Sequence, residues 1–153
     1  MPDDLSERRP PKPPIPYLLA YAHTLAARHA EEELRPHGLT IRQYGVLAQL
    51  ALEPELTTSE LARQLGVSRQ SLHEMVAELE RAGRLMRGPG ASGRTRRLAL
   101  TPETRRLLVR LREPVEWMEA DFLSGLTSRE IELLRRLLQR LLAHATDDET
   151  WLA

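Results

Sequence analysis

Residues 57–83, TTSELARQLGVSRQSLHEMVAELERAG, constrain the fold more than any other stretch of the chain. The first half has apolar residues at helical spacing, namely Leu61, Ala62 and Leu65. Gly66 can then adopt the left-handed conformation that ends a helix, and Ser68 can cap a second helix. That second helix has an apolar stripe at i, i+3, i+4 and i+7, made of Leu72, Met75, Val76 and Leu79. The stretch therefore predicts two helices joined by a corner of about three residues.

The face of the second helix opposite this stripe is polar and carries Arg69, Gln70, His73 and Glu74. A helix fits the DNA major groove, where its N-terminal residues lie nearest the base edges. Arg can bridge guanine O6 and N7, Gln can bridge adenine N6 and N7, and Glu can accept from cytosine N4. The hydroxyls of Ser68 and Ser71 can hold a phosphate. The pattern favours a helix–turn–helix that reads DNA, and a helical corner with a solvated face is the alternative.

The helical period stops between residues 84 and 101. Two short extended segments, 84–87 and 96–100, flank the turn-rich run GPGASG at 88–93. This pattern predicts a β-hairpin directly after the second helix. The hairpin carries Arg94, Arg96 and Arg97, which can reach the adjacent minor groove or its phosphates.

The charge distribution favours the same function, although the formal net charge is zero. Residues 63–112 contain 12 Arg and 4 Glu, a surplus of eight positive charges, whereas residues 1–62 and 113–153 have net charges of −3 and −5. A basic segment between acidic ends indicates polyanion binding on a more acidic scaffold.

Helix-start signals organise the rest of the chain. Capping boxes occur at 40–43, 57–60 and 127–130, and Thr101 precedes a proline at the first helical position. We expect helices at about 17–35, 40–52, 58–65, 69–82, 102–123 and 128–145, with Pro114 kinking or interrupting the fifth. The predicted organisation is a disordered Pro-rich arm (1–16), an N-terminal dimerisation helix (17–36), a winged helix–turn–helix domain (37–101), C-terminal linker and dimerisation helices (102–146) and a tail (147–153). The fold class is mainly α.

The terminal helices carry more apolar surface than a monomer of this size can bury, which predicts a homodimer. An intramolecular helix pair is the alternative. Two-fold symmetry would place two recognition helices about 34 Å apart on one face of DNA.

Three stretches, LTIRQYGVLAQL (39–50), residues 56–87 and GRTRRLALT (93–101), resemble the MarR family of winged-helix transcriptional regulators over residues 39–108. The resemblance implies a homodimer built from helices of both chain ends. It also implies a recognition helix at 69–82, a wing at 88–97 and a palindromic operator, which such proteins usually repress. The wing of the family commonly carries Asp-Arg-Arg, whereas this chain has Ser92, Gly93 and Arg94, so the acidic brace of the wing arginine is absent.

The resemblance further implies a small anionic aromatic effector bound between two lobes. The candidate lining residues are Tyr17, Tyr21, His23, Tyr44 and Trp117, although residues of these types more often serve in core or interface packing. The predicted DNA contacts are Thr58, Ser68, Arg69, Gln70, Ser71, His73, Glu74, Arg94, Arg96 and Arg97.

The sequence shows no motif typical of an enzyme, a metal-binding protein or a membrane protein. The chain has no cysteine, which excludes disulfides and thiolate metal sites, and its five histidines show no tight pairing. We find no catalytic motif, and we expect no enzyme activity, cofactor or metal. No signal peptide or membrane span is apparent, so we expect a cytoplasmic protein associated with the nucleoid through DNA. The alternatives are a winged-helix module that binds a protein, and an activator or architectural DNA binder without a ligand.

Overall fold

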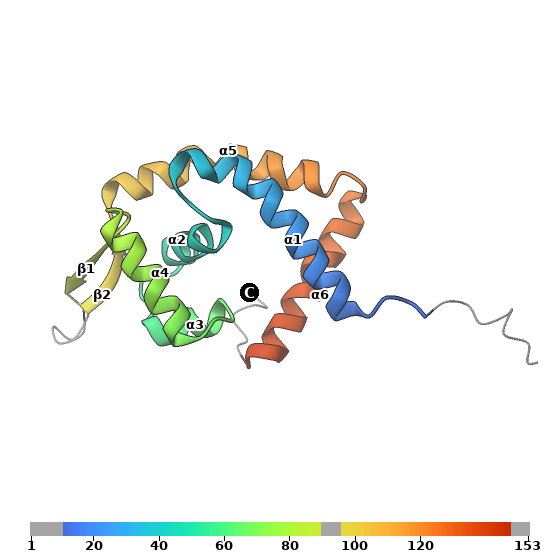
Figure 1. Ribbon diagram of the computed structural model, residues 1–153, viewed down its shortest axis with the longest axis horizontal. Helices are drawn as coiled ribbons and strands as arrows, with labels where there is room; N and C mark the ends of the chain where they lie inside the picture. Colours follow the sequence, from blue (N-terminus) through green and yellow to red (C-terminus); the bar gives the residue numbers. More distant parts are fainter. Residues whose placement is uncertain (1–10, 90–95, 148–153) are drawn as a thin grey trace, which may run out of the picture.

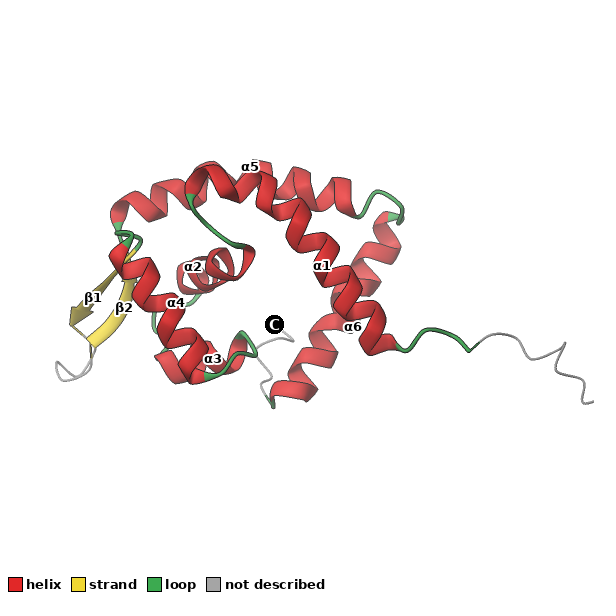
Figure 2. Cartoon of the chain, in the orientation of Figure 1, coloured by secondary structure: helices red, strands yellow, loops and turns green. Residues whose placement is uncertain are grey.

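The computed structural model describes residues 11–89 and 96–147, which are mainly helical with one two-stranded hairpin (Figure 2). In chain order the elements are α1 (Ile15–Leu34), the short 3₁₀ helix η2 (Arg35–His37), α2 (Ile41–Leu52), α3 (Thr58–Gln64), α4 (Arg69–Arg81), β1 (Leu85–Pro89), β2 (Arg96–Leu100), α5 (Pro102–Phe122) and α6 (Ser128–Thr146). The predicted fold class, a winged helix–turn–helix with helices from both chain ends, is confirmed.

The helices begin where the sequence signals indicated. All three predicted capping boxes form, with the side chains of Thr40, Thr57 and Thr127 each accepting the backbone N–H three residues on. Ser68 and Thr101 cap α4 and α5 in the same way. These hydroxyls satisfy N–H groups that have no partner inside the helix, so each helix start is fixed locally.

The core lies in the lobe formed by the C-terminal end of α1, α2, α3, α4, the hairpin and the first half of α5. Its most deeply buried large side chains, each under 2% exposed, are Leu34, Leu47, Leu61, Leu72, Leu79, Leu107, Val46, Val76 and Thr104. The antiparallel hairpin pairs Leu85 with Leu100 and Arg87 with Leu98. Arg84 Nη2 donates to the carbonyl of His37 at 2.8 Å, which ties the base of the hairpin to η2.

The long helices extend away from this lobe (Figure 1). Helix α5 spans the molecule from the hairpin to the far end, where the chain turns back into α6, and α1 packs against α5. Two details differ from expectation. Helix α1 begins at Ile15 rather than at residue 17, with Pro16 in its first turn. Helix α5 continues through Pro114 without interruption. Helix α6 buries no residue.

Candidate nucleic-acid interface

The corner between α3 and α4 fixes the direction in which α4 leaves the lobe. Gly66 has a φ of +62°, which a residue with a side chain rarely adopts. The Val67 N–H then donates to the Ala62 carbonyl at 3.0 Å, and the Ser71 N–H donates to Ser68 Oγ at 3.0 Å. On one side α4 buries Leu72, Val76 and Leu79. Because these residues are packed in the core, the opposite side of α4 faces outward.

The outward side of α4 is the predicted polar face. Arg69, Gln70, His73 and Glu74 are all exposed. Gln70 Nε2 donates to Glu74 Oε1 at 2.8 Å, so the carboxylate orients the amide. Among the other predicted contacts, Thr58 and Ser68 are exposed and Ser71 is half-buried.

A hollow of about 190 Å³ lies between α3, α4 and β1. Its polar lining is cationic and hydroxylic, comprising Thr58, Ser59, Arg69, His73 and Arg87. Leu72 and Val76 form its floor. Arg87 is the residue that sequence reasoning did not single out. The strand register places it beside α4, where its Nε donates to Glu80 Oε1 at 2.7 Å. This lining suits an anion such as a DNA phosphate.

The three predicted wing arginines, Arg94, Arg96 and Arg97, differ in their positions in the structure. Arg97 is half-buried and forms an ion pair with Glu55, which precedes α3, so its guanidinium is held within the lobe. Arg96 begins β2. Arg94, together with Ser92 and Gly93, lies outside the described residues.

The five candidate effector residues do not converge on one pocket. Tyr17 and Tyr21 stack on each other at a centroid distance of 6.2 Å, and both are exposed, as is His23. Tyr44 is half-buried in α2, and burial is the main cause that raises the pKa of its phenol. The nearby Arg112 opposes this shift, and Glu116 adds to it.

Trp117, the fifth candidate, is 71% exposed and lines a different hollow of about 570 Å³ between α1 and α5. Four carboxylates line this second hollow, from Glu32, Glu33, Glu113 and Asp121. His29 Nε2 bridges the two helices there, 2.8 Å from Asp121 Oδ2. Such a lining repels an anionic aromatic compound rather than attracting it.

Other site types are not seen in the described segments. Within residues 11–89 and 96–147, no three His, Asp or Glu side chains are grouped so as to hold a metal ion. No helix in that part of the chain has the length and apolar character to span a membrane.

An outward polar helix seated on a helical corner and followed by a two-stranded hairpin defines a winged helix–turn–helix regulator. The model of the MarR family matches residues 37–97. The "HTH-type transcriptional repressor Rv2887" of Mycobacterium tuberculosis is 31% identical over 129 residues, which cover 84% of this chain and 93% of that protein. The "Putative transcriptional regulatory protein for hcr operon" of Thauera aromatica is 34% identical over 114 residues, covering 74% of this chain and 68% of the relative.

Solved structures agree. The crystal structure of Rv2887 in complex with salicylic acid aligns with a TM-score of 0.67 at 30% identity, over 85% of this chain and 97% of that one. That of CouR from Rhodococcus jostii RHA1 bound to p-coumaroyl-CoA has a TM-score of 0.75 at 25% identity, over 84% and 91%. The chain belongs to the MarR family of transcriptional regulators.

Proposed function

We propose that the chain is a dimeric, sequence-specific repressor that binds a palindromic operator and is released by a small molecule. The capped N-terminal end of α4 carries this proposal, because a packed core directs its polar face outward at the end that would enter a groove. The curated relatives are named as repressors or regulators, which supports regulation of transcription over catalysis. A protein with this role acts in the cytoplasm, at the nucleoid.

The polar face of α4 offers both kinds of base contact. Arg69 supplies paired donors for guanine, and the Gln70–Glu74 pair presents acceptors for the amino groups of adenine or cytosine. The hollow lined by Arg69 and Arg87 would hold a backbone phosphate beside the groove. Arg87 and Arg97 are each paired with a carboxylate, of Glu80 and Glu55 respectively, so either side chain would exchange that partner for a phosphate on binding DNA.

The dimer is proposed from the apolar rows at the chain ends. On α6, Leu133, Leu137 and Leu141 are spaced four residues apart and are 47%, 50% and 45% exposed. On α1, Tyr17 and Leu18 are 59% and 46% exposed. Exposed apolar side chains on the helices of both chain ends are typical of a subunit interface. A two-fold axis there would pair two recognition helices on a palindrome.

An effector is proposed from the two relatives solved with salicylic acid and with p-coumaroyl-CoA. Both ligands combine an aromatic ring with negative charge. Tyr44 and Arg112 offer an aromatic ring and a cation close together, at the junction of α2 and α5. We therefore favour this junction over the acidic hollow around Trp117 as the place where such an anion would bind.

Selection of bound sequences from random DNA tests the function. We expect one enriched palindrome, and we expect Arg69→Ala to change the enriched bases at specific positions. The control is Arg42→Ala, an exposed arginine outside the polar face of α4. If the protein retained no DNA at low salt and instead captured a protein through residues 69–77, the protein-binding alternative would be favoured.

A further inference from the structure

One of the two arginines in the hollow between α3, α4 and β1 is already held by a carboxylate. Arg87 Nε donates to Glu80 Oε1 at 2.7 Å, and the two side chains are 36% and 29% exposed. Arg69, the other arginine of the hollow, forms no ion pair with any residue that the structure describes. The lining that would receive a DNA phosphate is therefore partly neutralised in the free protein.

Glu80 lies on the same side of α4 as this hollow, but beyond its end. The row along that side of the helix consists of Arg69, His73, Val76 and Glu80, at i, i+4, i+7 and i+11. The first three line the hollow, whereas Glu80 lies about 10 Å further along the helix axis than His73. The helix therefore places one carboxylate next to the hollow, within reach of Arg87.

The bond to Glu80 occupies a donor that a phosphate would need. A guanidinium binds a phosphate most strongly through two parallel N–H groups, and the Nε–H belongs to one such pair. The carboxylate and the phosphate are both oxyanions, so they compete for this edge of Arg87. If both stayed on it, they would also repel each other. Full binding of a phosphate at the hollow therefore requires that the Arg87–Glu80 pair breaks.

We propose that Glu80 sets the affinity for DNA by competing with the backbone phosphate for Arg87. The inference rests on the proposed function, because it concerns the same interface. Breaking the pair costs the same on every duplex, since every duplex presents a phosphate to the hollow. Glu80 therefore weakens binding to random DNA and to the operator alike. The consequence is that the free repressor binds random DNA less tightly than its basic surface alone would allow.

The other ion pair of the hairpin, between Arg97 and Glu55, lies on the opposite face of the two strands. Arg87 is opposite Leu98, whose side chain is buried in the core. Arg97 is the next residue along that strand, and successive residues of a strand point to opposite faces. The two pairs share no partner, so a change in one leaves the other in place and each can be tested alone.

A double-mutant cycle on DNA affinity tests the proposal. The Kd is measured by fluorescence anisotropy for the native protein, Glu80→Gln, Arg87→Ala and the double variant, on the selected palindrome and on a random-sequence duplex. We expect Glu80→Gln, which removes the charge and keeps the shape, to bind both duplexes more tightly. Arg87→Ala should lose more affinity in the Glu80→Gln background than in the native protein. The difference should be about two- to fivefold per half-site, as for a surface ion pair, and roughly 4- to 25-fold for a dimer on both half-sites.

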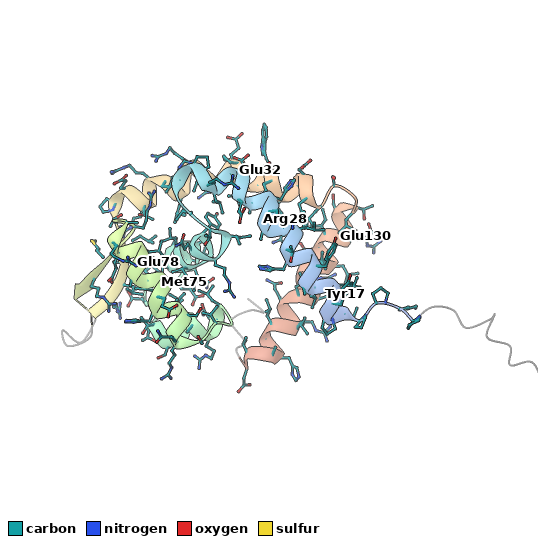
Figure 3. All side chains as sticks on the ribbon, in the orientation of Figure 1. Tyr17, Arg28, Glu32, Met75, Glu78 and Glu130 are labelled. Atoms are coloured by element: carbon teal, nitrogen blue, oxygen red, sulfur yellow. The ribbon has the colours of Figure 1, made fainter. Side chains whose placement is uncertain are left out.

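The sign of this difference distinguishes competition from the other roles of a carboxylate. An equal loss from Arg87→Ala in both backgrounds would mean that Glu80 acts only as a nearby charge. A smaller loss in the Glu80→Gln background would mean that Glu80 holds Arg87 in position for the phosphate. Either result would overturn the proposal. The matched control is Glu78→Gln, because Figure 3 shows Glu78 on the same helix and its carboxylate accepts from Gln43 Nε2 at 3.0 Å; it should leave the loss from Arg87→Ala unchanged.

Two further measurements keep the result interpretable. Urea denaturation should show that every variant is folded under the conditions of the binding assay. Glu80→Ala, which removes the acceptor as well as the charge, should give a difference of the same sign as Glu80→Gln. If the native protein bound no DNA at low salt, the proposed function would fail and this inference with it. If the native protein bound DNA but the cycle showed no larger loss, only this inference would fail.

Discussion

The apolar row on α6 gives the prediction with the most direct magnitude. Leu133, Leu137 and Leu141 form one stripe on a helix that buries no residue within the described chain. Leu137, in the middle of the stripe, is 50% exposed. If a partner protomer covers the stripe, truncation of Leu137 weakens the dimer without opening a cavity in the core of either protomer.

The size of this effect follows from the exposed fraction. Complete burial of a leucine side chain is worth about 1.5–3 kcal/mol. Half of the Leu137 side chain remains to be covered, which leaves about 0.7–1.5 kcal/mol per protomer. Two-fold symmetry doubles this to about 1.5–3 kcal/mol per dimer. Leu137→Ala should therefore raise the dimer Kd by roughly 10- to 150-fold, since about 1.4 kcal/mol corresponds to a factor of ten.

Dilution of the native and variant proteins, followed by sedimentation velocity, measures that Kd. Leu52→Ala is the matched control, because Leu52 lies on α2 and is 78% exposed. We expect it to leave the Kd unchanged. An unchanged Kd for Leu137→Ala, or an equal loss in the control, would refute the assignment of α6 to the dimer interface.

Three further predictions concern the recognition helix with β1 beside it, and α6. Ser68→Ala removes the cap of α4 and should lower the free energy of unfolding by about 1 kcal/mol in urea denaturation; no change would mean that the cap is dispensable. In competition assays, Gln70→Ala should reduce discrimination at one base position by about 1–3 kcal/mol. Arg87→Ala should instead weaken binding to all sequences alike. The reverse pattern would mean that Arg87 reads a base and Gln70 contacts the backbone. Hydrogen bonds from the Thr127 backbone and hydroxyl lower the pKa of Glu130 in the folded protein. The ionised carboxylate therefore stabilises the fold when the pH lies above the pKa of this group in the unfolded chain. This contribution is lost as the pH falls through the lowered pKa of the folded state. Thr127→Ala should move that pKa part of the way back up in an NMR titration, and an unmoved pKa would contradict this cause.

The sequence predicted the features that depend on neighbouring residues. The starts of α2 to α6 each have a capping residue whose partner lies three positions on, and these boundaries agree with the structure to within about two residues. The left-handed Gly66 and the buried stripe of α4 also follow from local spacing. Pro114 was expected to kink or interrupt α5, and the interruption does not occur: the helix continues through it with the Leu111 side packed on the core. Packing against the lobe offsets the lost hydrogen bond.

Features that join distant segments were not predictable in this way. Arg97 is paired with Glu55, far earlier in the chain, so a basic pattern alone could not distinguish a held arginine from one available to DNA. The acidic hollow forms only because the end of α1 lies against the second half of α5. Trp117 was therefore a reasonable candidate for an anion pocket by residue type, yet its surroundings carry the opposite charge.

Binding of the native protein to the palindrome selected from random DNA, measured by fluorescence anisotropy against a scrambled duplex at two salt concentrations, tests the central claim most directly. The polar face of α4 predicts tighter binding to the specific duplex by about 10³ or more, with both affinities falling as salt rises. Arg69→Ala with Gln70→Ala should remove most of the difference between the two duplexes while leaving the salt-dependent component largely intact. Equal affinity of the native protein for both duplexes, or no binding at low salt, would contradict the account.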